Sequence, residues 1–357
     1  MLALQATTPE SLASATGIAI NDARKIVAAV HRGEWPRDGE ALAGRSIRLR
    51  TFASVRRVAL QAVGALGHVP ELEIRSQRRS ALDPFVKVAL VTADGHVIEA
   101  VRIPLERAGR FSACVSSQAG CALGCLFCAT GRLGLARNLL TWEIVEQARV
   151  LRCTLRSDER LHGVVFQGMG EPLANVDRVV EAIRVMSHPC ALAIDARAIT
   201  VCTAGLPSGI RKLARDVPNV RLGLSIASAR RDVRRTLMPI DSSHSLEEVM
   251  DAVEEHARVT GRSPMWAVTP LAGVSDTEDD ARALAALALG FEARTGIRPR
   301  LSIVPYNRID CDGADPFRRG DPARFIERLV GHGVRPHLRY SGGADMAAAC
   351  GQLSGRS

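Results

Sequence analysis

The chain has 357 residues, of which 46% are hydrophobic and 24% charged, an ordinary balance for a folded soluble protein. No hydrophobic run is long enough to span a membrane, and the first residues lack the basic and apolar regions of a signal peptide, so we expect a cytoplasmic protein without a membrane partner. The net charge of +9 fits a polyanionic partner such as RNA, but a genome that favours arginine codons explains it equally well.

At this length we expect two domains, or one large barrel with an appendage. Residues 1–84 have apolar positions near helical spacing and predict a small helical N-terminal domain. Its arginine-rich segments, RSIRLRTFASVRR and EIRSQRR, could bind RNA or form a solvated helix face. Residues 85–106 alternate in the manner of strands around Asp94-Gly95, which predicts a β-hairpin connector. Glu99 lies on its second strand, where residue type alone suggests a solvent-facing side chain.

Three cysteines then form a C-x3-C-x2-C motif, Cys121, Cys125 and Cys128, with Cys114 a short loop upstream. In a reduced, cytosolic protein these thiols are better read as metal ligands than as a disulfide framework. A structural zinc site normally needs four protein ligands, often in two separated pairs. Three thiolates from one loop leave one iron of an iron–sulfur cluster open for a substrate or cofactor. Zinc and a chance match stay open on these residues alone.

Residues 107–340 repeat short apolar strands, each followed by a helical pattern, which predicts a parallel α/β barrel or open sheet. Candidate polar residues follow these strands directly, where α/β folds build their sites. A basic run after the strand LGLS could bind phosphates or be a helix surface; it comprises Arg230, Arg231, Arg234 and Arg235. The glycine-rich tail, residues 341–357, holds Cys350, which is either an incidental thiol or one delivered into an active site.

Taken together, these motifs resemble the RlmN/Cfr family of radical SAM RNA methyltransferases. The segments that carry the resemblance are EAVRIP, CVSSQAGCALGCLFCATG, GMGEPLAN, MPI, IVPYN and DMAAACGQL. The resemblance implies an α/β fold with a partial (β/α)6 radical SAM barrel at residues 107–340. It also implies a [4Fe–4S] cluster on Cys121, Cys125 and Cys128, and two molecules of S-adenosylmethionine (SAM) per turnover.

The same resemblance implies roles for further residues. SAM would be contacted by residues that match the family's SAM-site motifs, namely Gly170, Glu171, Cys202, Ser225, Ile226, Ala227 and Asn307. Two of these motifs depart from the common family form. Cys202 stands where relatives usually carry serine, and Ser225-Ile226-Ala227 lacks the usual histidine. Cys350 would carry the methyl group and Cys114 would resolve it through a transient disulfide. Glu99 would accept a proton from the substrate ring, an assignment that overrides the surface-strand interpretation.

The expected function is methylation of an adenine ring carbon, first C2 and second C8, in 23S rRNA and possibly tRNA. The expected partners are the RNA and an electron donor such as flavodoxin or ferredoxin, with the enzyme acting as a monomer. A non-RNA substrate on the same scaffold and a zinc-stabilised RNA-binding protein are the alternatives.

Overall fold

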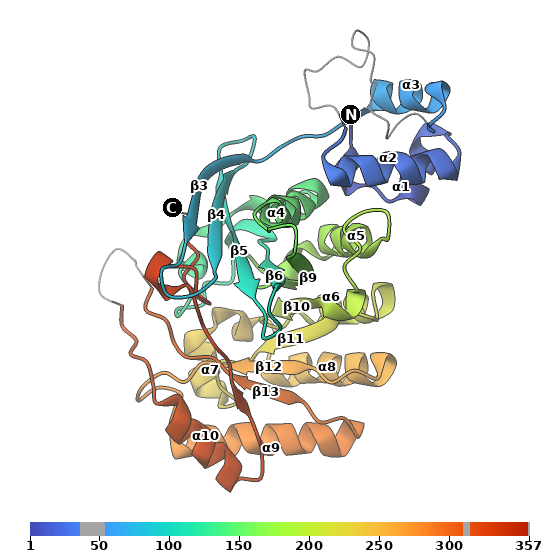
Figure 1. Cartoon of the computed structure of the whole chain (residues 1–357). Helices are drawn as coiled ribbons and strands as arrows, with labels where there is room; N and C mark the ends of the chain where they lie inside the picture. Colours follow the sequence, from blue (N-terminus) through green and yellow to red (C-terminus); the bar gives the residue numbers. More distant parts are fainter. Residues whose placement is uncertain (36–53, 310–314, 356–357) are drawn as a thin grey trace.

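The computed structural model describes residues 1–35, 54–309 and 315–355. A ten-stranded mixed sheet runs through the molecule in the order β14-β13-β12-β11-β10-β9-β6-β5-β4-β3 (Figure 1). Neighbouring strands from β6 to β14 are parallel, whereas those from β3 to β6 are antiparallel. The strands are β3 (Glu73–Arg79), β4 (Val86–Val91), β5 (Val97–Pro104), β6 (Arg110–Cys114), β9 (Arg160–Phe166), β10 (Ile199–Thr203), β11 (Arg221–Ser225), β12 (Met265–Val268), β13 (Arg300–Ile303) and β14 (His337–Leu338).

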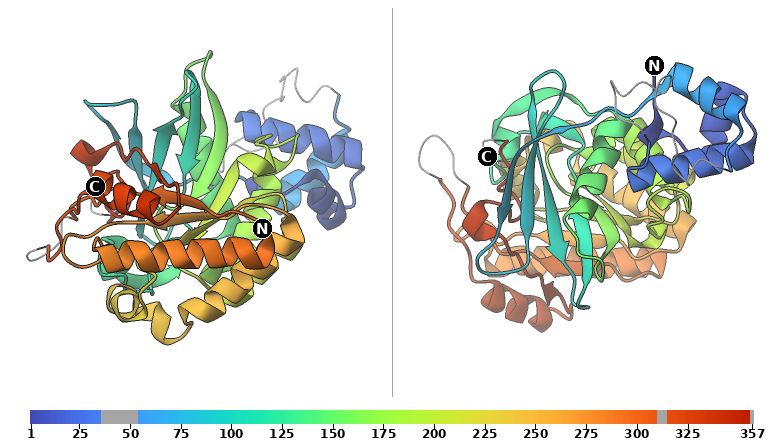
Figure 2. Two further views of the ribbon diagram at one scale, coloured as in Figure 1. Left: turned by 90° about the horizontal axis from the view of Figure 1, so that it is seen from below. Right: turned by 45° about the horizontal axis from the view of Figure 1, so that its top comes forward.

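Helices connect the parallel strands, and α4, α5, α6, α8 and α9 stack along one face of the sheet (Figures 1 and 2). Their buried residues form one continuous hydrophobic core with the sheet. This arrangement confirms the predicted α/β fold with a partial barrel. The helices are α4 (Thr141–Cys153), α5 (Val176–Ser187), α6 (Pro207–Asp216), α7 (Arg231–Leu237), α8 (Leu246–Thr260), α9 (Glu278–Thr295) and α10 (Pro322–Gly331).

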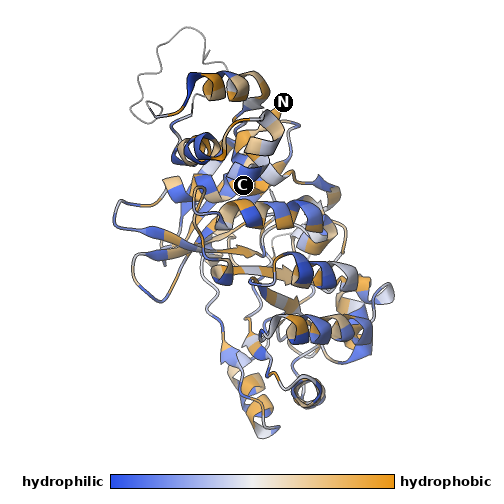
Figure 3. Cartoon of the chain, turned by 90° about the vertical axis from the view of Figure 1, so that its right-hand side faces the viewer, coloured by the Kyte–Doolittle hydropathy of each residue, from blue (hydrophilic) through white to orange (hydrophobic). Residues whose placement is uncertain are grey.

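Local sequence signals set the ends of the long helices. At the start of α8, the Ser245 hydroxyl accepts a hydrogen bond from the backbone N–H of Glu248, and the Glu248 carboxylate accepts one from the backbone N–H of Ser245. Helices α8 and α9 end at Gly261 and Gly296, which adopt the left-handed conformation that glycine tolerates. Hydrophobic and hydrophilic residues share the surface of these helices (Figure 3), and the apolar positions face the core.

The hairpin predicted at residues 85–106 is confirmed. Strands β4 and β5 pair antiparallel up to Val91 opposite Val97, and Gly95 in the turn has a φ of 84°. Strand β3 extends the sheet beyond β4. Its residues, 73–79, lie within the range expected to be helical, so that expectation is wrong for them. Ile74 is their one apolar side chain; pairing with β4, rather than a local pattern, makes them a strand.

The N-terminal helices pack around a separate hydrophobic cluster and lie beside α4 and α5 (Figure 1). Residues 36–53, which include much of the first arginine-rich segment, lie outside the described residues. No helix in the described part of the chain is long and apolar enough to cross a membrane. The elements here are β1 (Leu2–Ala3), α1 (Pro9–Thr16), α2 (Ile20–Arg32), α3 (Arg57–Leu66) and β2 (Gly67–His68).

Candidate active site

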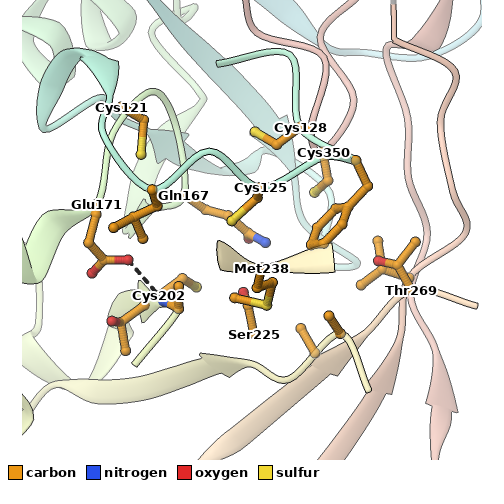
Figure 4. Close-up of a pocket in the computed structure, with 18 of the residues that line it drawn as sticks. Cys121, Cys125, Cys128, Gln167, Glu171, Cys202, Ser225, Met238, Thr269 and Cys350 are labelled. Carbon is orange, nitrogen blue, oxygen red and sulfur yellow. Dashed lines mark hydrogen bonds between the residues drawn. The ribbon is translucent and has the colours of Figure 1, made fainter. Parts of the chain in front are cut away.

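A cavity of about 160 Å3 lies at the carboxyl ends of the parallel strands (Figure 4). The structure brings together there most of the residues singled out from the sequence. Those that line the cavity are Cys121, Cys125, Cys128, Gly170, Glu171, Cys202, Ser225, Ala227, Asn307 and Cys350. Because consecutive parallel strands end at the same edge of a sheet, residues far apart in the sequence meet at this point.

The three motif cysteines lie on one loop that begins at the end of β7 (Gln118–Cys121) and returns through β8 (Gly134–Asn138). The backbone N–H of Leu126 donates to the Leu237 carbonyl at 3.0 Å, which fixes the loop to the end of α7. A Cβ at Gly131 would lie 2.8 Å from the Cys125 carbonyl oxygen, so only glycine lets the chain pass so close. The contact with α7 and the close approach at Gly131 therefore fix the shape of the loop.

Burial raises the pKa of Cys121 to about 11, and it also raises those of Cys125 and Cys128. These thiols need a nearby positive charge to become thiolates at neutral pH, and iron would supply it. Within the described residues, no three His, Cys, Asp or Glu side chains are grouped tightly enough to hold a single metal ion. A [4Fe–4S] cluster binds each thiolate through a different iron, and three thiols on one buried loop are the donor set that it would take.

Gly170 and Glu171 follow β9 and form the wall beside the cysteine loop. Gly170 has a φ of 97°, and a Cβ there would lie 2.5 Å from Cβ of Gln118. The Glu171 carboxylate is buried and accepts hydrogen bonds from the backbone N–H groups of Leu173 at 3.0 Å and Ala204 at 2.9 Å. Burial raises the pKa of Glu171, although these N–H donors oppose the rise. The carboxylate thus ties the end of β9 to the end of β10.

Two other residues singled out from the sequence make contacts that their motifs did not indicate. Ile226 follows β11, but its side chain packs into the hydrophobic core and does not line the cavity. Asn307 does line it, and its side-chain amide donates to the Ser341 hydroxyl at 2.8 Å and to the Cys350 carbonyl at 3.2 Å. Asn307 therefore holds the C-terminal segment as well as facing the cavity.

Cys350 lies where two cavities meet. It faces the three motif cysteines in the first cavity (Figure 4), and it lines a second one of about 90 Å3 together with Cys114 and Arg339. Both Cys350 and Cys114 are free thiols in this structure. Burial raises the pKa of Cys114 to about 12. Two thiols 236 positions apart in the sequence are thus neighbours in the fold, as a resolving pair requires.

Glu99 lines neither cavity. Its side chain is fully buried, and one carboxylate oxygen lies 3.0 Å from the ammonium of Lys87. The other oxygen accepts hydrogen bonds from the backbone N–H groups of Ser354 and Gly355. The solvent-facing interpretation of Glu99 is therefore wrong. The carboxylate is engaged with the segment that carries Cys350.

The sequence patterns missed several residues that shape the site. Gln167, Met238 and Thr269 line the first cavity (Figure 4). Each of them follows or adjoins a motif or strand that the sequence had revealed, and only this adjacency could have predicted their place in the site. Arg234, which belongs to the basic run after β11, is fully buried and forms an ion pair with Asp241 at 2.9 Å. Arg234 therefore neither forms an exposed helix surface nor is available to bind phosphates, the two roles that the sequence suggested for this basic run.

The fold and the match to a family model define the class of protein. The radical SAM superfamily model matches residues 115–288. The whole chain superposes on a radical SAM methyltransferase from Sphaerobacter thermophilus with a TM-score of 0.85 and 28% identity, covering 100% of both chains. The protein is thus a SAM-dependent methyltransferase of the radical SAM class, which implies a [4Fe–4S] cluster and SAM as cofactors.

The curated relatives narrow this class to a family. A probable RNA methyltransferase of Sorangium cellulosum is 55% identical over 97% of this chain and 90% of its own length. A probable dual-specificity RNA methyltransferase RlmN of Moorella thermoacetica is 34% identical over 91% of this chain and 93% of its own. The chain belongs to the RlmN/Cfr family of radical SAM RNA methyltransferases, and the resemblance seen in its motifs is confirmed.

Proposed function

We propose that the protein methylates a ring carbon of an adenine in RNA, with C2 of an adenine in 23S rRNA as the first target and tRNA as a further substrate. Relatives named dual-specificity RNA methyltransferases support an RNA substrate. The observation that carries the proposal is the position of Cys350, which shares one cavity with the motif cysteines and another with Cys114. Such a position suits a thiol that receives a methyl group on one side and is resolved on the other.

In this proposal Cys121, Cys125 and Cys128 hold the cluster, and residues at the ends of β9, β10, β11 and β13 hold SAM. When bound, two molecules of SAM and the cluster supply a methyl group and a carbon radical. The target base must leave its stack to reach the cavity, because a ring carbon inside a helix is inaccessible. An electron donor such as flavodoxin or ferredoxin serves the enzyme, which acts in the cytoplasm as a monomer.

The remaining steps fall to three side chains. Cys350 accepts the methyl group on sulfur, because a thiolate is a good nucleophile, and carries it to the adenine. Glu99 accepts the proton that leaves the ring. Cys114 then attacks the sulfur of Cys350; the bond between that sulfur and the transferred carbon breaks, the carbon takes up a proton to complete the methyl group, and the Cys114–Cys350 disulfide is left on the protein.

Nucleoside mass spectrometry of rRNA and tRNA, from cells with and without the gene, tests the proposal. We expect 2-methyladenosine to disappear in the absence of the gene; loss of 8-methyladenosine instead would move the target to C8. Unchanged methyladenosine in both RNAs would reject an RNA substrate.

Cysteine variants test the mechanism. A Cys350→Ala variant should bind the cluster and SAM but form no methylated RNA. A Cys114→Ala variant should accumulate a protein–RNA crosslink, because nothing resolves the adduct on Cys350. Cys153→Ala, which removes an exposed thiol at the end of α4, is the matched control and should turn over normally. Normal turnover by the Cys350 or Cys114 variant would reject its assigned role.

A further inference from the structure

Lys87 is one of only three lysines in a chain whose other basic residues are arginines. Unlike Lys25 and Lys212, it is buried: its side chain is 3% exposed on β4. Its ammonium lies 3.0 Å from Oε1 of Glu99 on the adjacent strand β5, whose side chain is 0% exposed. Burying two charges is costly unless each is paired and also hydrogen-bonded. The groups that hydrogen-bond to this pair therefore identify the segments that the pair holds in place.

The pair holds the C-terminal segment on both sides of Cys350. Before the cysteine, the Lys87 ammonium donates to the carbonyl of Ala347 at 3.3 Å. After it, the backbone N–H groups of Ser354 and Gly355 donate to Oε2 of Glu99 at 2.8 Å and 3.1 Å. The two side chains therefore fasten both ends of the segment 347–355, with Cys350 between the attachment points.

The same pair is tied to the wall of the first cavity. The backbone carbonyl of Glu99 accepts a hydrogen bond from the Ser116 hydroxyl at 2.7 Å. That hydroxyl in turn accepts one from the backbone N–H of Met169, within the GMGEP turn, at 2.8 Å. The position of β5 and the position of the turn beside the proposed SAM site are therefore linked through one buried hydroxyl.

We propose that Lys87 is a positioning residue that sets the place of Cys350 by holding the Glu99 carboxylate and the Ala347 carbonyl at the same time. A lysine suits this task because its ammonium offers three donors that rotate about a single bond, and it serves a carboxylate on one strand and a carbonyl on another segment. A neutral side chain of similar length would leave both acceptors without this donor and Glu99 without its countercharge.

A consequence for turnover rests on the proposed function. With one oxygen of Glu99 bound to Lys87 and the other to the backbone N–H groups of Ser354 and Gly355, the carboxylate does not reach either cavity. To accept a proton in the proposed function, Glu99 must come within reach of a cavity, and loss of the two tail N–H groups would free its second oxygen for the substrate.

Hydrogen–deuterium exchange on the full chain, purified without oxygen and without RNA, tests the positioning role. In Lys87→Met we expect exchange in the peptide that covers residues 347–355 to rise about 10- to 100-fold, the range set by the loss of hydrogen bonds to charged groups. Peptides from β11 and α8 should exchange as in the wild type, which shows an intact fold. Lys87→Arg, which keeps the charge and the donors, should restore most of the protection.

Matched variants make the result decisive. Lys212→Met removes a partly exposed lysine that pairs with Asp177 and Asp216, and it should leave the tail peptide unchanged. Glu99→Gln keeps an oxygen for the tail but removes the charge that Lys87 holds, so it should also loosen the peptide. Wild-type protection of the tail in folded Lys87→Met overturns the proposal; if that variant does not fold, wild-type protection in Glu99→Gln does so.

Steady-state kinetics separate positioning from a general loss of structure. Lys87→Met should lower kcat about 10-fold or more while the KM for SAM stays within about twofold, because Lys87 lines neither cavity and the Ser116 link to the turn after β9 uses the backbone carbonyl of Glu99, not its side chain. A raised KM with an unchanged kcat would contradict the role. A wild-type enzyme without activity on any RNA would refute the proposed function but would leave the contrast in exchange standing.

Discussion

The buried cation Arg234 offers the sharpest test of how the site is built. Its side chain is fully buried, and Nε lies 2.9 Å from Oδ1 of Asp241. Nη1 donates to the Ile226 carbonyl at 2.6 Å and Nη2 to the Ala204 carbonyl at 2.8 Å. Arg234 thus joins the chain after β10 to the chain after β11, where the wall of the cavity is formed.

We predict that Arg234→Met lowers the free energy of unfolding by about 3 to 5 kcal/mol. Methionine keeps the apolar stem but leaves Asp241 buried without a countercharge, and breaking a buried ion pair on one side costs about that much. Urea denaturation of the full chain, followed by tryptophan fluorescence to which the buried Trp266 contributes, measures the change. SAM binding should weaken in the same variant, because the two strand ends lose their common donor.

Two controls separate the ion pair from the general effect of a mutation in α7. Arg235→Met alters the next residue, which is exposed, and should change the free energy of unfolding by less than about 0.5 kcal/mol. The double variant Arg234→Met with Asp241→Leu should recover much of the loss, because no buried charge then lacks a partner. A loss below about 1 kcal/mol in the single variant, or a double variant less stable than the single one, would refute this reasoning.

Two further predictions concern a glycine and a histidine. Gly170→Ala should weaken SAM binding at least 10-fold in calorimetry, because its Cβ would meet Gln118 at 2.5 Å. Gly273→Ala, at a similar positive φ but with open space around it, should not weaken SAM binding. Equal effects of the two variants would contradict a steric cause. His256 is buried without a hydrogen-bond partner for either ring nitrogen among the described residues, and burial lowers its pKa to about 4. The unfolded chain therefore takes up the proton first as the pH falls from 6.5 to 4, and stability is lost over that range. In His256→Leu the loss between pH 7 and pH 5 should be about 2 kcal/mol smaller in urea denaturation, and an unchanged loss would contradict burial of the neutral ring.

The repeating patterns of the sequence are local, and they predicted the repeating parts of the fold. Short apolar strands followed by amphipathic helices indicated a parallel sheet, and Asp94-Gly95 indicated the hairpin, because these signals act between residues close in the chain. Strand β3 was not predicted because its residues show no alternation of apolar and polar side chains. Its extended form is explained by its pairing with β4.

The spacing of the three cysteines indicated a metal or cluster site, and this motif together with the tail motif around Cys350 and the other family segments indicated the family. Neither one stated that Cys350 and Cys114 share a cavity, although the resemblance led us to expect it. The side chain of Ile226 shows the converse, since a motif position placed it in the site and the pleat of the chain after β11 turned it into the core.

The sequence by itself determined the class of the fold, the three-cysteine loop proposed to hold the cluster and the family to which the chain belongs. The tertiary structure alone decided what the buried charges do. Arg234 was one cation of a run that could bind phosphates or form a helix surface. Lys87 was a single lysine on a strand. Residue type alone suggested a surface position for Glu99, and only the family resemblance gave it a catalytic role. Whether a charge is buried, and which group offsets it, depends on segments that folding brings together from distant parts of the chain, and no local pattern records that.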